Sequence, residues 1–70
     1  MKQIKYIAHC IEAGEQFITT FKTKETDERK LKRMGVELAV GWGAECIKVE
    51  KDDDQSDLAE VYDADKEGTL

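Results

Sequence analysis

The most informative pattern of apolar and polar residues lies between Thr26 and Glu50, where a helical period gives way to an alternating one. Four large apolar side chains recur there at spacings of three and four residues, the period of a helix with one buried face. They are Leu31, Met34, Leu38 and Trp42. We therefore expect a helix whose core-facing stripe contains all four side chains.

Both ends of this helix carry recognisable signals. Thr26 and Asp27 are residue types that cap helix N-termini, and acidic Asp27 and Glu28 suit the positive end of the helix dipole. Glycine adopts without strain the left-handed conformation that commonly ends a helix. We therefore expect the C-terminus near Gly41 or Gly43.

The residues beside and after the stripe predict how the helix meets a sheet. Gly35 and Ala39 flank the stripe and are small, which would let the helix backbone approach a sheet closely. After the helix, residues 45–51 alternate polar and apolar side chains around Ile47 and Val49, the pattern of a strand. The stretch therefore predicts a helix, a turn and a strand.

The N-terminal residues 2–12 fit two structures. Their apolar positions match a short helix ending before Gly14, whereas their isoleucine and tyrosine content suits a strand. Residues 16–23 form a second run rich in aromatic and β-branched side chains, and Gly14 supplies the positive backbone angle that short hairpin loops need. We favour a β-hairpin.

The first strand of this hairpin carries apolar residues on both faces, which is typical of a central strand. One face presents Ile4, Tyr6 and Ala8, and the other presents Ile7 and Ile11. A right-handed crossover would place the third strand beside the first. We expect an α+β domain over residues 1–51, with a β-β-α-β chain and a three-stranded antiparallel sheet of order 2-1-3. One helix would pack on one face, leaving the other face and an edge for a partner.

The two parts of the chain differ in charge. Residues 1–49 carry nine Lys or Arg and seven Asp or Glu, a net charge of +2. Residues 50–70 carry two Lys and nine Asp or Glu, a net charge of −7. The chain is therefore expected to be dipolar, with an acidic C-terminal segment that either keeps the protein solvated or docks on a basic surface.

This acidic C-terminal segment, residues 52–70, predicts little regular structure. Asp57 and Glu60 form a capping-box pattern, so we expect a short helix over residues 57–63. From Ala64 to Leu70 the chain is charged and almost without apolar side chains, and we expect a disordered end.

The back of the predicted helix is unusual for a solvated face. Val36 and Val40 fall opposite the core stripe, close to Arg29, Lys32 and Arg33. Two interpretations remain open: scattered surface valines, which monomers tolerate, and a contact patch rimmed by guanidinium groups. A second candidate contact is acidic and consists of Asp52, Asp53 and Asp54.

The side chains that carry catalytic or metal chemistry do not form a recognisable set. His9 and Cys10 are adjacent, so a strand would point them to opposite faces, and Cys46 is the remaining soft ligand. A structural zinc site needs four ligands in close pairs, and a cysteine nucleophile needs an oriented base. We expect no metal, no cofactor and no enzymatic activity.

The aspartates after the third strand resemble a calcium loop only in part. Asp52, Asp54, Ser56 and Asp63 stand at ligand positions, but Asp57 occupies the position that requires glycine. A strand also enters where the loop needs a helix. We therefore interpret this stretch as a solvated acidic loop.

Length and composition limit which classes of protein this chain can belong to. Seventy residues make one small domain, and no apolar run approaches the roughly 20 residues of a membrane span. The basic run over residues 29–33, with Lys22 and Lys24, could contact phosphates, but a sequence pI near 4.8 argues against nucleic-acid binding. Two cysteines and a charged start without a signal-peptide pattern lead us to expect free thiols and the cytoplasm.

Over residues 16–50 the order of elements resembles small phage-encoded accessory proteins of β-β-α-β shape, a group that includes the T7-type inhibitors of host RNA polymerase. The matching positions are Asp27, Glu28, Trp42, Gly43, Ala44 and Glu45. The resemblance implies a small acidic protein that blocks a host machine by binding it, in the host cytoplasm.

Together these observations favour a non-catalytic protein-binding module that inhibits or regulates a larger protein. Its candidate partner-binding residues are Arg29, Arg33, Val36, Val40, Asp52, Asp53 and Asp54. The first alternative is a homodimeric structural or scaffolding protein whose open sheet faces pair, and the second is a nucleic-acid-binding accessory protein.

Overall fold

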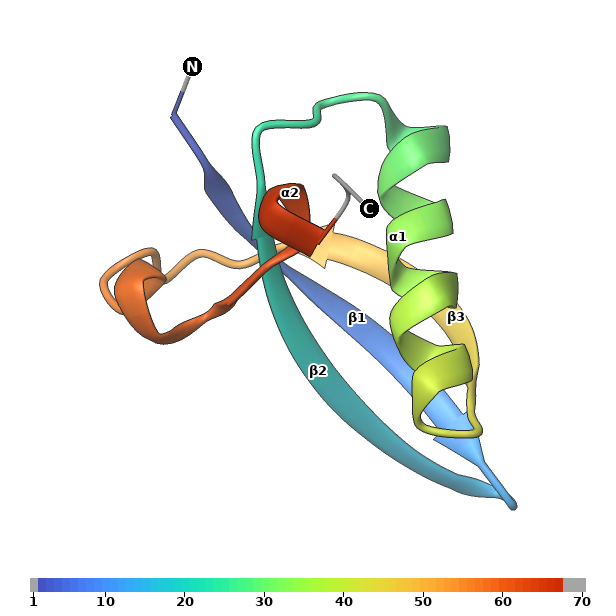
Figure 1. Cartoon of the computed structure of the whole chain (residues 1–70). Coiled ribbons are helices and arrows are strands. Elements are labelled where there is room, and N and C mark those ends of the chain that lie inside the picture. Colours follow the sequence, from blue (N-terminus) through green and yellow to red (C-terminus); the bar gives the residue numbers. More distant parts are fainter. Residues whose placement is uncertain (1, 68–70) are drawn as a thin grey trace.

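A computed structural model, which describes residues 2–67, is centred on a long β-hairpin (Figure 1). Strands β1 (Ile4–Glu12) and β2 (Glu15–Thr23) pair antiparallel from end to end. They are joined by Ala13 and Gly14, whose φ angles of 50° and 85° are both positive. The hairpin prediction for the N-terminal residues is confirmed, as is the positive backbone angle at Gly14.

Helix α1 (Glu28–Gly41) follows the hairpin and has the predicted ends. The Asp27 side chain caps its N-terminus by accepting a hydrogen bond of 2.9 Å from the backbone N–H of Arg29. The helix ends at Gly41, and Gly43 adopts a φ of 73° in the turn that follows. The turn is closed by a hydrogen bond of 2.8 Å from the N–H of Ala44 to the carbonyl of Ala39.

Strand β3 (Glu45–Lys51) pairs antiparallel with β1 on the side opposite β2, which confirms the predicted order 2-1-3 for these three strands. The register shifts where His9 lies opposite Lys48 but Cys10 lies opposite Cys46. Ile47 is therefore an extra residue in β3, and the strand carries a β-bulge at this point.

The sheet contains a fourth strand that the sequence analysis did not predict. Strand β4 (Tyr62–Asp63) runs parallel to β2 and pairs with Phe21 and Lys22. The prediction of a three-stranded, fully antiparallel sheet was therefore wrong, because the acidic segment returns to the free edge of β2. The sheet is mixed, with the order β3-β1-β2-β4.

Short helical turns flank β4, and the single helix predicted over residues 57–63 is replaced by a 3-10 turn followed by the strand itself. A 3-10 helix, η1 (Leu58–Glu60), precedes β4, and Asp57 makes no side-chain capping bond to it. After β4 the chain forms a single helical turn, α2 (Ala64–Glu67), where the sequence predicts disorder from Ala64. The rest of that predicted disordered end, residues 68–70, lies outside the described residues.

The core lies between the sheet and α1. Among the described residues its buried hydrophobic members are Tyr6, Ala8, Cys10, Phe21, Leu31, Ala39 and Cys46. Gly35 permits a close approach, because a Cβ there would lie 2.5 Å from Cγ2 of Val49 and 3.0 Å from the Sγ of Cys46. The predicted role of Gly35 and Ala39 in bringing the helix onto the sheet is confirmed.

The predicted core stripe is correct for three of its four residues. Leu31 is buried, and Met34 and Leu38 are half-buried against the core. Trp42 is 64% exposed, so its assignment to the core was wrong. It is the C-cap residue, with φ −97° and ψ 0°, and its side chain no longer follows the helical period.

The described chain is small and compact, with a radius of gyration of 11.5 Å. Of the helices in residues 2–67, none is long and apolar enough to cross a membrane.

Candidate partner-binding surfaces

The molecule exposes more large apolar side chains than it buries. Three large hydrophobic side chains are buried among the described residues, and these are Tyr6, Phe21 and Leu31. Six are exposed: Ile18, Val36, Val40, Trp42, Ile47 and Tyr62. Exposed apolar groups that cluster are a common mark of interaction surfaces.

The back of α1 forms the first surface, which we call the outer helix face and define by Arg29, Arg33, Val36 and Val40. All four predicted residues are exposed, and Val40 is 68% accessible. Lys32 borders this face and donates a hydrogen bond of 3.0 Å to the carbonyl of Ile47 in β3. The surface therefore combines two valines with two guanidinium groups.

A groove separates the other side of α1 from β2, and we call it the β2 groove. It has a volume of about 440 Å³. Its lining residues are Thr19, Thr20, Glu37, Leu38, Gly41, Trp42 and Tyr62. The sequence did not predict this groove, because the helical period assigns Trp42 to the core. The position of Trp42 directly after Gly41 was the available signal, since a residue beyond the helix end need not follow its stripe.

A third concavity, the β3 groove, lies between the first turns of α1 and β3 and has a volume of about 530 Å³. Its charged lining residues are Glu28, Lys32, Lys48, Glu50 and Lys51. Two of these pair with each other, since Nζ of Lys48 lies 3.6 Å from a carboxylate oxygen of Glu50. In the β2 groove, by comparison, Glu37 is the charged residue in the lining.

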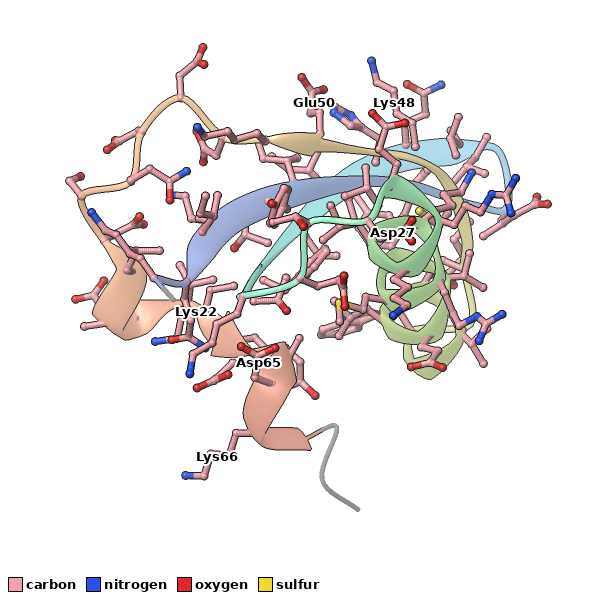
Figure 2. All side chains as sticks on the ribbon, turned by 90° about the horizontal axis from the view of Figure 1, so that it is seen from above. Lys22, Asp27, Lys48, Glu50, Asp65 and Lys66 are labelled. Atoms are coloured by element: carbon pink, nitrogen blue, oxygen red, sulfur yellow. The ribbon has the colours of Figure 1, made fainter. Side chains whose placement is uncertain are left out.

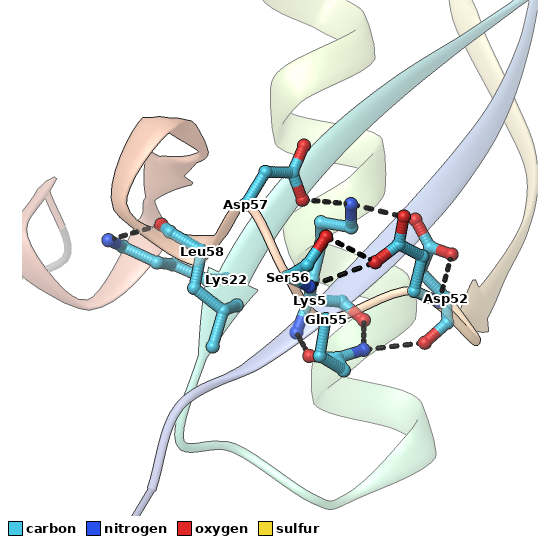
Figure 3. A network of polar contacts seen from close by, with 8 residues as sticks. Lys5, Lys22, Asp52, Gln55, Ser56, Asp57 and Leu58 are labelled. Carbon is cyan, nitrogen blue, oxygen red and sulfur yellow. Dashed lines mark hydrogen bonds and ion pairs between the residues drawn. The ribbon is translucent and has the colours of Figure 1, made fainter.

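The acidic candidate residues Asp52, Asp53 and Asp54 lie in the loop that follows β3. Figure 3 shows Asp52 and Asp57 of this segment beside Lys5. The ammonium of Lys5 is buried and pairs with Asp57 and, at 3.0 Å, with Asp52. Its hydrogen bonds to Asp57 and then Asp52 raise the pKa of Lys5. The backbone N–H of Asp54, followed by Lys5, holds the pKa of Asp52 below its usual range.

The other two aspartates of the loop differ in their contacts. Asp54 accepts hydrogen bonds from the hydroxyl and the backbone N–H of Ser56, at 2.6 and 2.9 Å, which lower its pKa. Asp53 is exposed. Two of the three predicted acidic contact residues are therefore engaged within the chain.

A second anchor holds the end of the described chain at Asp65. Its carboxylate accepts hydrogen bonds from the hydroxyl of Thr23 at 2.5 Å, the N–H of Lys24 at 2.9 Å and the side chain of Gln3 at 3.1 Å. Burial alone would raise the pKa of Asp65, but these bonds outweigh it and lower the pKa. Residues 52–67, which we call the C-terminal strap, are thus fixed at Lys5 and at Thr23.

The sheet face opposite α1 carries a polar pair among isoleucines. His9 contacts the carboxylate of Glu50, and this bond, with the nearby Lys48, lowers the pKa of Glu50. Figure 2 shows Glu50 and Lys48 on the side of the sheet away from α1. Ile18, which lies opposite His9 in the hairpin, is 59% exposed.

The two cysteines lie opposite each other on β1 and β3 and are buried as free thiols. Burial raises the pKa of Cys10 and of Cys46, so both stay protonated and weakly nucleophilic at neutral pH. In the part of the chain that the structure describes, no three His, Cys, Asp or Glu side chains are grouped to hold a metal ion.

Comparison with known proteins leaves the chain without assigned relatives: no family model, no curated protein and no solved structure matches it. The resemblance to phage-encoded inhibitors therefore stays a prediction.

Proposed function

We propose that this chain is a non-catalytic protein-binding module that inhibits or regulates a larger protein, and that it binds through the outer helix face. The observation that carries the proposal is the exposure of Val36 and Val40 beside Arg29 and Arg33. Arginine and apolar side chains together are enriched at the centres of protein interfaces.

The charge of the outer helix face specifies the partner. Arg29 and Arg33 favour an acidic surface with an apolar centre for Val36 and Val40. Guanidinium groups bind carboxylates in a bidentate geometry, so each pair adds orientation as well as energy. The partner is therefore expected to be a folded protein with an acidic patch.

The acidic mode of binding is less favoured by the geometry. Asp52 pairs with the buried Lys5, and Asp54 accepts two hydrogen bonds from Ser56. A basic partner would have to compete with these internal contacts. The exposed Asp53 is a single charge, which gives little affinity by itself.

The test uses the full chain and a partner identified by affinity capture and then purified. We expect the double variant Arg29→Glu/Arg33→Glu and the single variant Val40→Asp each to weaken binding at least tenfold in a calorimetric titration. Asp53→Lys is the matched control, because it reverses an exposed charge in the C-terminal strap. Loss of binding in Asp53→Lys alone would favour the acidic mode and reject the outer helix face.

The open sheet face supports one alternative, a homodimeric scaffolding protein. Ile18 and Ile47 are both exposed, on strands that flank β1. Two such faces packed together would bury these side chains and the half-buried Ile7 and Ile11. Sedimentation at micromolar concentration distinguishes the two functions, since a strict monomer rejects the dimer.

A further inference from the structure

The outer strand edge of β2 is only partly used by the chain. β1 pairs with β2 along its whole length on one side. On the other side, β4 pairs with Phe21 and Lys22. Within residues 2–67, the stretch Glu15–Thr20 therefore has a strand on one side only. Backbone N–H and C=O groups that point outward from such an edge can pair with a strand of another chain.

The chain itself shows that this edge accepts an added strand. Tyr62 and Asp63 join it in parallel orientation at the end nearest Thr23. The residues before them, Leu58–Glu60, form a 3-10 helix and do not continue the pairing toward Glu15. The C-terminal strap thus occupies the last part of the edge and leaves the first part accessible.

Two concavities lie along the accessible part of the edge. The β2 groove is bordered by Thr19 and Thr20 and is flanked by two exposed aromatic side chains, Trp42 and Tyr62. A second concavity of about 310 Å³ lies at the hairpin tip. It is lined by Glu12, Ala13, Glu15, Gln16 and Phe17. An added strand would place alternate side chains toward these two hollows.

The charges around the two concavities have one sign. Glu12 and Glu15 line the hollow at the hairpin tip, and Glu37 lines the β2 groove. All three are exposed, and neither concavity has a Lys or Arg in its lining. An incoming strand with cationic side chains would therefore be attracted, and an acidic strand or a phosphate backbone would be repelled.

We propose that the edge of β2 from Glu15 to Thr20 binds an extended, lysine- or arginine-bearing segment of a partner protein as an added strand, with one apolar side chain between Trp42 and Tyr62. The inference rests on the proposed protein-binding function and adds a second binding surface to it. This surface attracts cationic segments, whereas the outer helix face attracts acidic ones. It can fail independently, because the outer helix face and the β2 edge share no residue.

The experiment titrates the full chain with a synthetic probe, the capped peptide Lys-Val-Lys-Phe-Lys-Val-Lys. Trp42 is the only tryptophan of the chain, so its fluorescence reports directly on the β2 groove. The matched control peptide replaces both valines with proline, which keeps the charge but removes two backbone donors. We expect the control to bind at least tenfold more weakly, and amide exchange across Glu15–Thr20 to slow at least threefold with the probe.

Charge variants of the protein complete the test. Glu15→Lys/Glu37→Lys is expected to weaken binding of the probe at least tenfold, while Glu45→Lys, which changes an exposed residue of β3 at the opposite edge of the sheet, leaves it within twofold. Circular dichroism establishes that each variant is folded. Equal affinity for the two peptides, protection of Glu45–Lys51 in place of Glu15–Thr20, or no binding of the probe at millimolar concentration would each overturn the proposal.

Discussion

The two flanks of α1 are built differently, although they belong to one short helix. On the β3 flank Gly35 brings the helix backbone onto Val49 and Cys46, and β3 is the strand that α1 approaches most extensively. On the β2 flank the helix and the strand are separated by the β2 groove, with Trp42 exposed at its end. Figure 1 shows α1 beside β3, with β2 curving away.

The difference concentrates the close packing of α1 on one of its two flanks. Close packing gains dispersion and hydrophobic energy where the backbones approach, so the β3 flank holds the fold together. The β2 flank leaves two aromatic side chains accessible, a cost that a binding partner would recover. In the proposed binding at the β2 edge, stability and partner binding would therefore depend on opposite sides of the helix.

The largest expected effect breaks the close-packed flank. Gly35→Val would force new methyl groups against Val49 and Cys46, and we expect a loss of about 2–3 kcal/mol of unfolding free energy, typical of overpacking. Gly41→Ala is the matched control: a Cβ there meets nothing within 4 Å, and the better helix former should stabilise by roughly 0.5–1 kcal/mol. Urea denaturation measures both, and equal effects would contradict the asymmetry.

A smaller effect is expected at the strap that borders the open flank. Asp65→Ala removes the acceptor of the buried Thr23 hydroxyl and of the Lys24 N–H. We expect a loss of about 1–3 kcal/mol, the cost of an unsatisfied buried group. Amide exchange should increase at Lys24 and across Tyr62–Asp63 and remain slow in β3. Uniform acceleration in all strands would show that the strap is part of one cooperative unit.

Acid is expected to loosen the same strap. The pKa values of Asp52, Asp54 and Asp65 are lowered in the folded chain, so their contribution is complete above the ordinary aspartate value near 3.9 and is lost as pH falls through the lowered values. The melting temperature should fall between pH 5 and pH 2. In Asp65→Asn this fall should be shallower, and an unchanged slope would mean that Asp65 contributes nothing to it.

The smallest effect on stability is expected at Trp42. Because its side chain is 64% exposed, Trp42→Ala should change the unfolding free energy by less than about 0.5 kcal/mol. Binding of the lysine-rich probe peptide should nevertheless weaken. A large loss of stability would place Trp42 in the core after all and would remove the contrast between the two flanks.

The features that the sequence predicts correctly depend on local chemistry. Asp27 caps the helix, and Gly43 adopts a positive φ in the turn directly after it; each follows from the preference of one residue type. The strand order could also be predicted, because Ile7 and Ile11 make the first strand apolar on both faces and so place it at the centre.

The features that the sequence does not predict depend on contacts between distant residues. Strand β4 contains two residues, which is too short for any periodic pattern, and the strap is held by Lys5 with Asp57 and by Thr23 with Asp65. Each pair joins residues more than 40 positions apart. Trp42 was predicted wrongly for a different reason. The helical period assigns it to the buried face, but the helix ends one residue earlier, at Gly41.

The bulge at Ile47 has a consequence for how copies of this protein behave at high concentration. A sheet with two regular edges can grow from both, and its chains can stack without end into ribbons or fibrils. Here one edge is kinked by the extra residue, which disrupts the regular spacing of its backbone groups. The bulge therefore disfavours regular strand addition at β3, whereas Glu15–Thr20 of β2 contains no such irregularity. A ribbon that grows by strand addition needs a regular edge on both sides of each copy, so the bulge in β3 is expected to limit such growth.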